Sequence, residues 1–370
     1  MRQHRGLLSV ILAAFVFCAI EPAAADTVCL KAISRDGRVT LKKRVVSGAT
    51  CPRGFTNVIN TATLTGPQGA DGSLRIYGTA DAADASITSN TSLTGGALIY
   101  NNFTVQDGVT LTVDSGTVIR CYGTFTNNGT INVNTAAKGV MNFSYGAFDF
   151  PSISVPHPGI AHSAAGLGET GDTSDNRVGG DGADGLTEQE ASMLRYPGPN
   201  AGGGGAGIST SSYGFASVDG GGSFVVLARE GIVNNGVIHA DGGTALSTSG
   251  YGGGGGGILI LASPVQARNN GIISANGGNG ANATATFRIA GGGGGGGGII
   301  HFISPEIVAG LATATKGSGG TSAVRTNTGT AYGGGGGGAC GGDGGGGGMV
   351  QGVGVGTNIA GGHAGDDGYV

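Results

Sequence analysis

Short segments in which apolar and polar residues alternate dominate the chain from residue 73 to about residue 140. They occupy residues 103–105, 109–113, 117–119, 124–126 and 130–133. A period of two residues is typical of β-strands with one buried face. Turn sequences such as Asp107-Gly108 and Asn127-Asn128-Gly129 separate the segments. This region is therefore predicted to form short strands joined by tight turns, either in a β-solenoid or in a β-sandwich.

An internal repeat favours the solenoid. The motif Asn-Asn-Gly-x-Ile occurs at residues 127–131, 234–238 and 269–273, and apolar segments recur beside it at residues 224–228, 258–262 and 299–303. Glycine runs end at Gly257, Gly298 and Gly338, which are 41 and 40 residues apart. A unit of two short strands and a glycine run cannot bury its own apolar face. We therefore predict an all-β fold, a parallel β-solenoid or β-helix in which such units stack.

The alternation also predicts which side chains of the repeated strands face the core. The inward set is predicted to be Ile131, Val133, Ile238, Ala240, Ile273 and Ala275, and the outward set Asn132, Asn134, His239, Asp241, Ser274 and Asn276. Stacking in register would align the outward residues as polar ladders. We interpret His239 as part of such a ladder, since an exposed strand histidine is seldom catalytic.

Glycine makes up 82 of the 370 residues, whereas charged residues make up 11% and tryptophan is absent. Collagen needs glycine at every third position and disordered chains carry more charge, so neither describes the whole chain. Glycine runs lie at residues 202–205, 252–257, 291–298 and 333–338. Ordering them costs much backbone entropy, which favours close packing as polyglycine helices of the polyproline II type. Flexible loops are the alternative.

The first 25 residues have the pattern of a secretory signal peptide, with Arg2 and Arg5 before an apolar run and an Ala23-Ala24-Ala25 cleavage site. The predicted location is therefore secreted or at the cell surface, with no membrane span in the mature chain. Removing Arg2, Arg5 and Glu21 from the 19 basic and 23 acidic residues leaves a net charge of −5. No basic tract suggests a nucleic-acid partner.

Residues 26–72 are predicted to form a separate small head. Its cysteines, Cys29 and Cys51, would close a short disulfide loop in an oxidising compartment. Two collagen-type triplets and a glycine follow at residues 66–72. The pairing of Cys121 with Cys340, which lie far apart in the sequence, is left open.

A long insertion at residues 141–207 separates the opening strands (73–140) from the glycine-rich repeats (208–370). Residues 179–187 match one nonapeptide of the calcium-binding β-roll, with Asp181 and Asp184 as candidate oxygen ligands for calcium. Residues 187–195 have a helical pattern, in which Thr187 and Glu190 form a capping box. An insertion in a repetitive scaffold is where recognition is normally placed.

Three resemblances follow from these motifs. The sequence Cys51-Pro52-Arg53-Gly54 with the triplets after it resembles the N-terminal heads of secreted bacterial collagen-like proteins. The Asn-Asn-Gly-x-Ile copies, the glycine runs before residues 258–262, and residues 361–365 resemble secreted glycine-rich repeat proteins of bacteria, whose activity is not established. The glycine spacing is remotely similar to that of phage tail-tip adhesins, in which polyglycine helices pack together. This resemblance implies binding through loops.

No nucleophile elbow, zinc-protease motif, Walker lysine or dinucleotide fingerprint occurs in the sequence. The predicted function is that of an exported, non-enzymatic surface or matrix protein, adhesive or structural, with an extracellular glycan or cell-surface ligand as partner. The alternative is a carbohydrate-active β-helix enzyme, a polysaccharide lyase or hydrolase that uses carboxylates such as Asp181 and Asp184. Ice or mineral binding by threonine ladders around Thr110 and Thr112 is a third hypothesis.

Overall fold

The computed structural model divides the chain into two compact units, Met1–Leu74 and Arg75–Val370. In the first unit it describes residues 26–35, 38–47, 53 and 56–60. In the second it describes residues 76–143, 156–168, 170–171, 179–209, 218–245, 250–283, 288–323, 331–332, 334–350 and 359–370.

The described part of the first unit is a three-stranded antiparallel sheet in the order β2-β1-β3. Its strands are β1 (Asp26–Arg35), β2 (Arg38–Ser47) and β3 (Thr56–Asn60). The backbone of Cys29 on β1 lies opposite Arg44 on β2. The Cys29 side chain, Cys51, the signal peptide and the triplets at 66–72 lie outside the described residues. The disulfide between Cys29 and Cys51 therefore stays a prediction.

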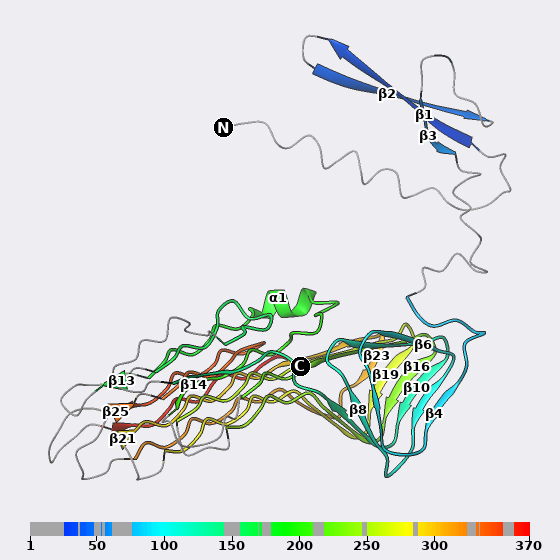
Figure 1. Ribbon diagram of the computed structural model, residues 1–370. Coiled ribbons are helices and arrows are strands. Elements are labelled where there is room, and N and C mark those ends of the chain that lie inside the picture. Colours follow the sequence, from blue (N-terminus) through cyan, green and yellow to red (C-terminus); the bar gives the residue numbers. More distant parts are fainter. Residues whose placement is uncertain are drawn as a thin grey trace. The chain divides into compact units, whose positions relative to one another are not determined.

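The second unit contains a parallel β-helix with three sides (Figure 1). Side 1 consists of β4 (Ala85–Ile87), β7 (Phe103–Val105), β10 (Thr124–Asn127), β16 (Gly231–Asn234), β19 (Gln266–Asn269) and β23 (Glu306–Val308). Side 2 consists of β5 (Thr91–Leu93), β8 (Thr110–Val113), β11 (Thr130–Val133), β17 (Val237–His239), β20 (Ile272–Ser274) and β24 (Leu311–Thr313). Side 3 consists of β6 (Ala97–Tyr100), β9 (Thr117–Cys121), β15 (Ser223–Ala228), β18 (Ile258–Ala262) and β22 (Ile299–Ile303).

Each coil of the β-helix contributes one strand to each side, which confirms the predicted parallel solenoid. The predicted unit of two strands was wrong, because a coil has three. The missed strands are those of side 1 in the later coils, where β19 (Gln-Ala-Arg-Asn) has only one apolar residue, whereas β7 and β10 of side 1 were predicted. The segment around Tyr369 takes the sixth position on side 3, since Tyr369 forms a parallel bridge with Ile299.

The core is built from inward side chains that stack coil upon coil. On side 1 the rings of Phe103 and Phe125 are parallel within 2°, with centroids 5.5 Å apart. On side 2 Ile131, Ile238 and Ile273 are fully buried and in register. The predicted inward set is thereby confirmed, because Val133, Ala240 and Ala275 are buried as well. Burial of such stacks supplies the main stabilisation of a solenoid.

Two asparagine ladders explain the repeated Asn-Asn-Gly motif. Inside the coil, Asn127 Nδ2 donates to Asn234 Oδ1 (2.7 Å), and Asn234 Nδ2 donates to Asn269 Oδ1 (2.8 Å). Outside, the direction is reversed, because Asn235 Nδ2 donates to Asn128 Oδ1 and Asn270 Nδ2 donates to Asn235 Oδ1. The glycine is needed because a Cβ on Gly236 would lie 1.9 Å from the carbonyl oxygen of Gly129. Each copy therefore fixes the register of one coil upon the next.

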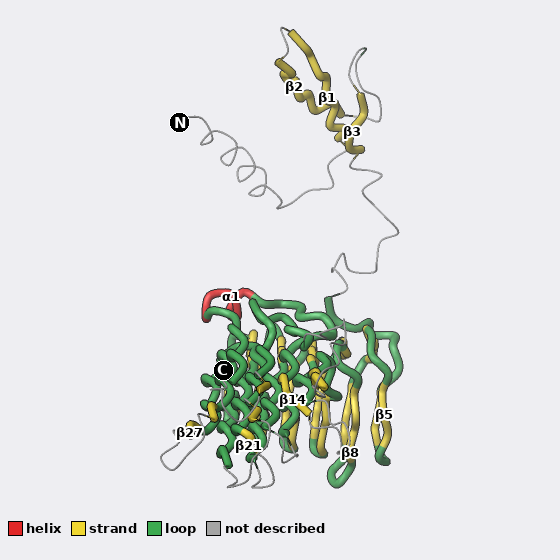
Figure 2. Tube along the Cα trace, turned by 60° about the vertical axis from the view of Figure 1, so that its left-hand side comes forward, coloured by secondary structure: helices red, strands yellow, loops and turns green. Residues whose placement is uncertain are grey.

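The corner between sides 2 and 3 is drawn out into long excursions in the later coils. In the first two coils it is a tight turn that contains Gly96 or Gly116, each with positive φ. In the next coils it spans residues 134–222, 240–257, 275–298 and 314–368. Figures 1 and 2 show the described parts of these excursions as extended chains running side by side, without regular sheet or helix over most of their length.

The excursions pack as polyglycine helices of the polyproline II type. In the run 252–257 every third amide donates to the same neighbouring chain. The amides of residues 252 and 255 donate to Ala206 and Gly203, and those of residues 253 and 256 donate to Gly293 and Gly296. The amides of residues 254 and 257 donate to Gly243 and Ala240. This period of three is that of a threefold helix bonded to its neighbours on all sides. The packing prediction is confirmed, and the alternative of flexible loops is wrong for these runs.

The bundle extends the β-helix layer by layer. Chains that leave side 2, such as 240–245 and 275–283, bond to each other in coil order, as do the chains that return to side 3. Outgoing and returning chains run antiparallel, since Gly254 donates to Gly243 and Gly295 donates to Gly278. Residues 201–206 and 334–348 cover the returning layer, and residues 179–187 bond in turn to the chain 334–348. The strands β13 (Thr170–Gly171), β21 (Arg288–Ile289) and β25 (Ala331–Tyr332) lie at the end of the bundle away from the β-helix (Figure 1).

We expect steric contact, not glycine content, to decide which glycines are essential. A Cβ on Gly295 would lie 2.0 Å from the carbonyl oxygen of Gly254, whereas a Cβ on Gly346 would have no heavy atom nearer than 3.8 Å. Gly295→Ala should therefore lower the free energy of unfolding by about 1–3 kcal/mol or more. Gly346→Ala should be neutral or slightly stabilising. Urea unfolding of both variants checks this, and equal stabilities would contradict it.

Candidate functional site

Described residues of the insertion at 141–207 pack against the outer face of side 3. Ala191 and Ala201 from the insertion pack with Val225, Ile258 and Ile260 of β15 and β18, and Cys340 joins the same apolar cluster. The strands β15 and β18 of side 3 are therefore buried on both faces, which accounts for their almost continuous apolar sequences. The segment 179–187 is itself a chain of the bundle, because Gly180, Ala183 and Leu186 donate to Gly334, Gly337 and Cys340.

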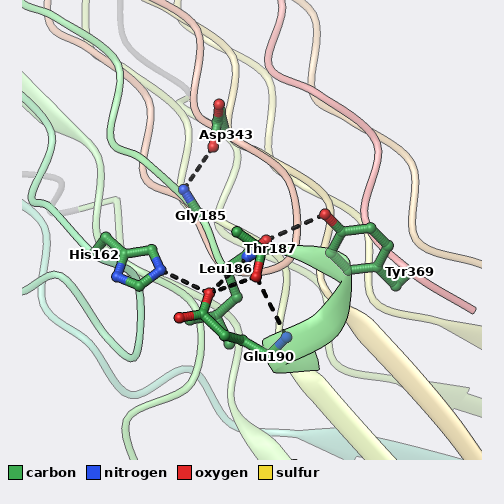
Figure 3. Close-up of polar contacts among 7 residues, drawn as sticks. All are labelled: His162, Gly185, Leu186, Thr187, Glu190, Asp343 and Tyr369. Carbon is green, nitrogen blue, oxygen red and sulfur yellow. Dashed lines mark hydrogen bonds and ion pairs between the residues drawn. The ribbon is translucent and has the colours of Figure 1, made fainter. Parts of the chain in front are cut away.

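The insertion carries the only α-helix among the described residues, α1 (Glu188–Met193), as predicted. Thr187 is its N-cap and forms a capping box with Glu190. The Oε2 atom of Glu190 accepts from Thr187 N (2.9 Å) and Thr187 Oγ1 (2.8 Å), and it lies 2.8 Å from His162 Nε2 (Figure 3). These contacts, led by the backbone bond to Thr187, lower the pKa of Glu190 to about 2.

The segment before α1 is held from two further chains. Asp343 Oδ1 accepts from the amide of Gly185 (2.7 Å), and the Tyr369 hydroxyl donates to the carbonyl of Leu186 (3.2 Å; Figure 3). Burial, followed by the charges of Glu188 and Asp343, raises the pKa of Tyr369. The phenol therefore stays protonated and available as a donor at neutral pH. Contacts from distant parts of the sequence thus fix the position of the short helix.

Exposed side chains of mixed chemistry surround this fixed helix. His162 and Glu190 have side chains that are 50% and 41% exposed, and Asp184 is exposed beside Ser163. Met193 at the end of α1 and Tyr196 just after it are 60% and 65% exposed. We call His162, Asp184, Glu190, Met193 and Tyr196 the insertion surface. Sequence reasoning placed recognition in the insertion but missed Tyr196, whose exposure depends on where α1 ends.

The two candidate calcium ligands lie on one chain of the bundle. Asp181 and Asp184 are both exposed, and three residues make one turn of a threefold helix, so they lie on the same side of the chain. Asp184 Oδ2 accepts from Ser163 Oγ (3.2 Å). The described residues contain no group of three or more His, Cys, Asp or Glu side chains placed to hold a metal ion. Calcium binding by this pair therefore stays a prediction from the sequence.

The outward set forms the predicted polar ladder on side 2. Asn132, His239 and Ser274 are in register. Ser274 Oγ donates to Asp241 Oδ2 (2.9 Å) and lies 2.7 Å from His239 Nδ1. In a catalytic triad the serine donates to histidine, and the acid binds the other ring nitrogen. Here both neighbours lie at Nδ1, the serine bonds the acid, and only 3% of Ser274 is exposed, so the cluster is not a triad.

A flat threonine array around Thr110 and Thr112 does not extend along side 2. Thr110 lies opposite Thr130, but the next residue in register is Val237. Thr112 lies opposite Asn132, and the next residue is His239. The flat threonine array that ice or mineral binding would need is therefore not formed by these strands.

The two cysteines of the second unit are unpaired and buried. Cys121 points into the core of the β-helix, whereas Cys340 belongs to the apolar cluster on the outer face of side 3. The open question of their pairing is thereby answered, because one sheet separates them. Burial raises the pKa of each thiol to about 12.

A scan against protein-family models found no match, and searches of curated proteins and of solved structures found none either. In the described part of the chain, no helix is long and apolar enough to cross a membrane. A function must therefore be argued from the residues of the insertion surface and from the scaffold that holds them.

The lowered pKa of Glu190 predicts an acid-sensitive contact. A carboxyl whose pKa falls on folding stabilises the folded state above its unfolded pKa, near 4.5, and loses this contribution as the pH falls to about 2. Glu190→Gln should therefore lower the thermal midpoint at neutral pH, and the difference from wild type should shrink at low pH. Glu188→Gln is the control, because it removes a first-turn charge and leaves the capping box intact. A difference that does not depend on pH would contradict the assignment.

The raised thiol pKa values predict inert cysteines. At pH 8 the thiolate fraction of Cys121 and Cys340 is very small and both are buried, so a thiol reagent should label neither in the native protein. Both should be labelled after unfolding in urea under the same conditions. Peptide mass mapping checks each site, and rapid native labelling of Cys340 would show that its cover opens.

Proposed function

We propose that this protein is an exported, non-enzymatic surface or extracellular-matrix protein that binds a glycan through the insertion surface. An exposed aromatic ring together with carboxylate and imidazole groups is suited to a sugar, which offers apolar C–H faces and hydroxyl groups together. Tyr196 supplies the exposed ring just after the end of α1, and the contacting pair Glu190 and His162 supplies the carboxylate and the imidazole. The observation that carries the proposal is the exposure of Tyr196 just after α1, a helix whose position is fixed by contacts from other chains.

The scaffold supports this proposal through its rigidity. Binding loses free energy when it must order the groups that make contact. The chain before α1 bonds into the polyglycine bundle, and the capping box and the Tyr369 contact hold the helix start. A surface held in this way is prepared for a ligand before binding. The same rigidity suits a structural role in a matrix.

The test is a glycan-array and whole-cell binding screen of the mature chain, followed by variants. Tyr196→Ala should weaken binding to the best ligand about tenfold, which corresponds to 1.4 kcal/mol, without changing the thermal midpoint. Ile99→Ala is the matched control, because Ile99 is 46% exposed on β6. Equal binding by both variants would contradict the role of the insertion surface.

A parallel activity screen distinguishes the enzyme alternative. The same glycans are incubated with the wild-type protein and with Asp181→Asn and Asp184→Asn, and products are measured by mass spectrometry. We expect no cleavage by any of the three. Cleavage that is lost in a variant with an unchanged thermal midpoint would overturn the non-enzymatic proposal in favour of a lyase or hydrolase.

A further inference from the structure

Exposed apolar side chains concentrate on the last two coils of the β-helix. Five of the ten exposed large hydrophobic residues in the described chain lie there: Val265, Ile272, Ile307, Val308 and Leu311. Ile307 is in register with Ala267, Ile232 and Phe125, which are inward and at most 1% exposed. Ile307 itself is 48% exposed. The core is therefore open at this end.

Within the described residues, the same end presents strand edges with no further strand paired to them. β23 and β24 are edge strands of sides 1 and 2, and β4 and β5 are the edge strands at the opposite end. Free edges are commonly protected by lysine, proline or bulges. The sequences Glu-Ile-Val and Leu-Ala-Thr at one end, and Ala-Ser-Ile and Thr-Ser-Leu at the other, contain neither lysine nor proline. The only charge, on Glu306, is paired with Arg268.

The polyglycine bundle, by contrast, protects its outer chains with side chains. Asn276 Oδ1 accepts from both the amide and the hydroxyl of Thr315, and Asn279 and Asn282 bind Ser318 and Thr321 in the same way. These contacts satisfy amides that would otherwise be free to bind another chain. Within the same unit, the outer chains of the polyglycine bundle are therefore protected by side chains, whereas the end strands of the β-helix are not.

We propose that the last coil binds the first coil of a second copy of this chain, so that copies assemble head to tail. Such a contact continues the coil-on-coil packing that already exists five times within the β-helix. β4 and β5 of the second copy have the direction and the three-sided arrangement needed to pair with β23 and β24 together. Continued register places Ala85 opposite Ile307, so that a small residue covers a larger one.

The geometry disfavours a symmetric contact between two last coils. A twofold axis reverses the direction of the chain around the coil, so it can match at most one side with itself. A second side would then face a different side of the partner. Head-to-tail contacts match all three sides at once and do not close, so they produce linear chains of copies. This inference is independent of the proposed glycan binding.

Two edge variants and their mixture test the proposal by analytical ultracentrifugation of the mature chain. The wild type should associate with rising concentration. Ile307→Lys places a charge in the open end of the last coil, and Thr91→Lys places one in the first coil, where Thr91 is exposed and in register with the inward Leu111. Each variant alone should be monomeric, because an inward-pointing charge blocks edge pairing.

An equimolar mixture of the two variants should form dimers and nothing larger. Each dimer would use the intact last coil of the Thr91→Lys copy and the intact first coil of the Ile307→Lys copy. Met193→Lys is the matched control on an exposed apolar residue of α1, and it should associate like the wild type. Circular dichroism and thermal midpoints establish that the variants fold, and Ala312→Lys, at the inward position of β24 in register with Ile273, replaces Ile307→Lys if that variant unfolds.

Three results would overturn the proposal. The first is a wild type that stays monomeric at every concentration, and the second is a mixture that stays monomeric although the wild type associates. The third is association of Thr91→Lys alone, which would indicate a symmetric contact between last coils or a contact elsewhere.

Discussion

The structure depends on the need of each backbone amide to find a partner when no side chain is present to shield it. In the glycine runs every third amide turns to the same neighbour, so a chain is satisfied only when neighbours lie around it. An isolated glycine run would lose these interchain hydrogen bonds but would still carry the entropic cost of ordering its backbone. The runs therefore order each other, and the close approach that makes this possible leaves no space for Cβ atoms. None of the described residues in these runs has positive φ, so glycine is needed there for its size and not for its backbone freedom.

The β-helix supplies the alignment that the bundle cannot supply for itself. Bare chains could slide along one another, because each residue is like the next. The asparagine ladders and the stacked inward side chains remove this freedom by fixing which coil lies on which. The excursions then start at neighbouring positions on side 2 and end at neighbouring positions on side 3. Specific side-chain packing in one half of the unit thus determines the register of the half that lacks side chains.

Much of this arrangement could be predicted from the sequence, because repetition makes the relevant signals strong. The Asn-Asn-Gly copies, the apolar segments that became β15, β18 and β22, and the capping box of Thr187 and Glu190 are each local patterns with one structural meaning. The side 1 strands of the later coils were missed because a strand such as β19 shows too little alternation to stand out. The contact of His162 with Glu190 and the exposure of Tyr196 depend on the path of the insertion over side 3, which no local pattern encodes. Side-chain positions in the head lie outside the described residues, and its disulfide stays a prediction.

The excursions show how such a scaffold can accommodate change. Partners in the inner asparagine ladder are separated by 107 residues in one step and by 35 in the next, yet they make the same contact. The stacking of the coils therefore does not depend on how many residues are inserted at the corner between sides 2 and 3. The inserted chain needs only to leave side 2 and return to side 3 at the same positions. Duplication or replacement of an excursion would alter the outer layers and leave the stacked centre untouched. Insertions at this corner would let related proteins evolve different outer surfaces while they keep the same fold.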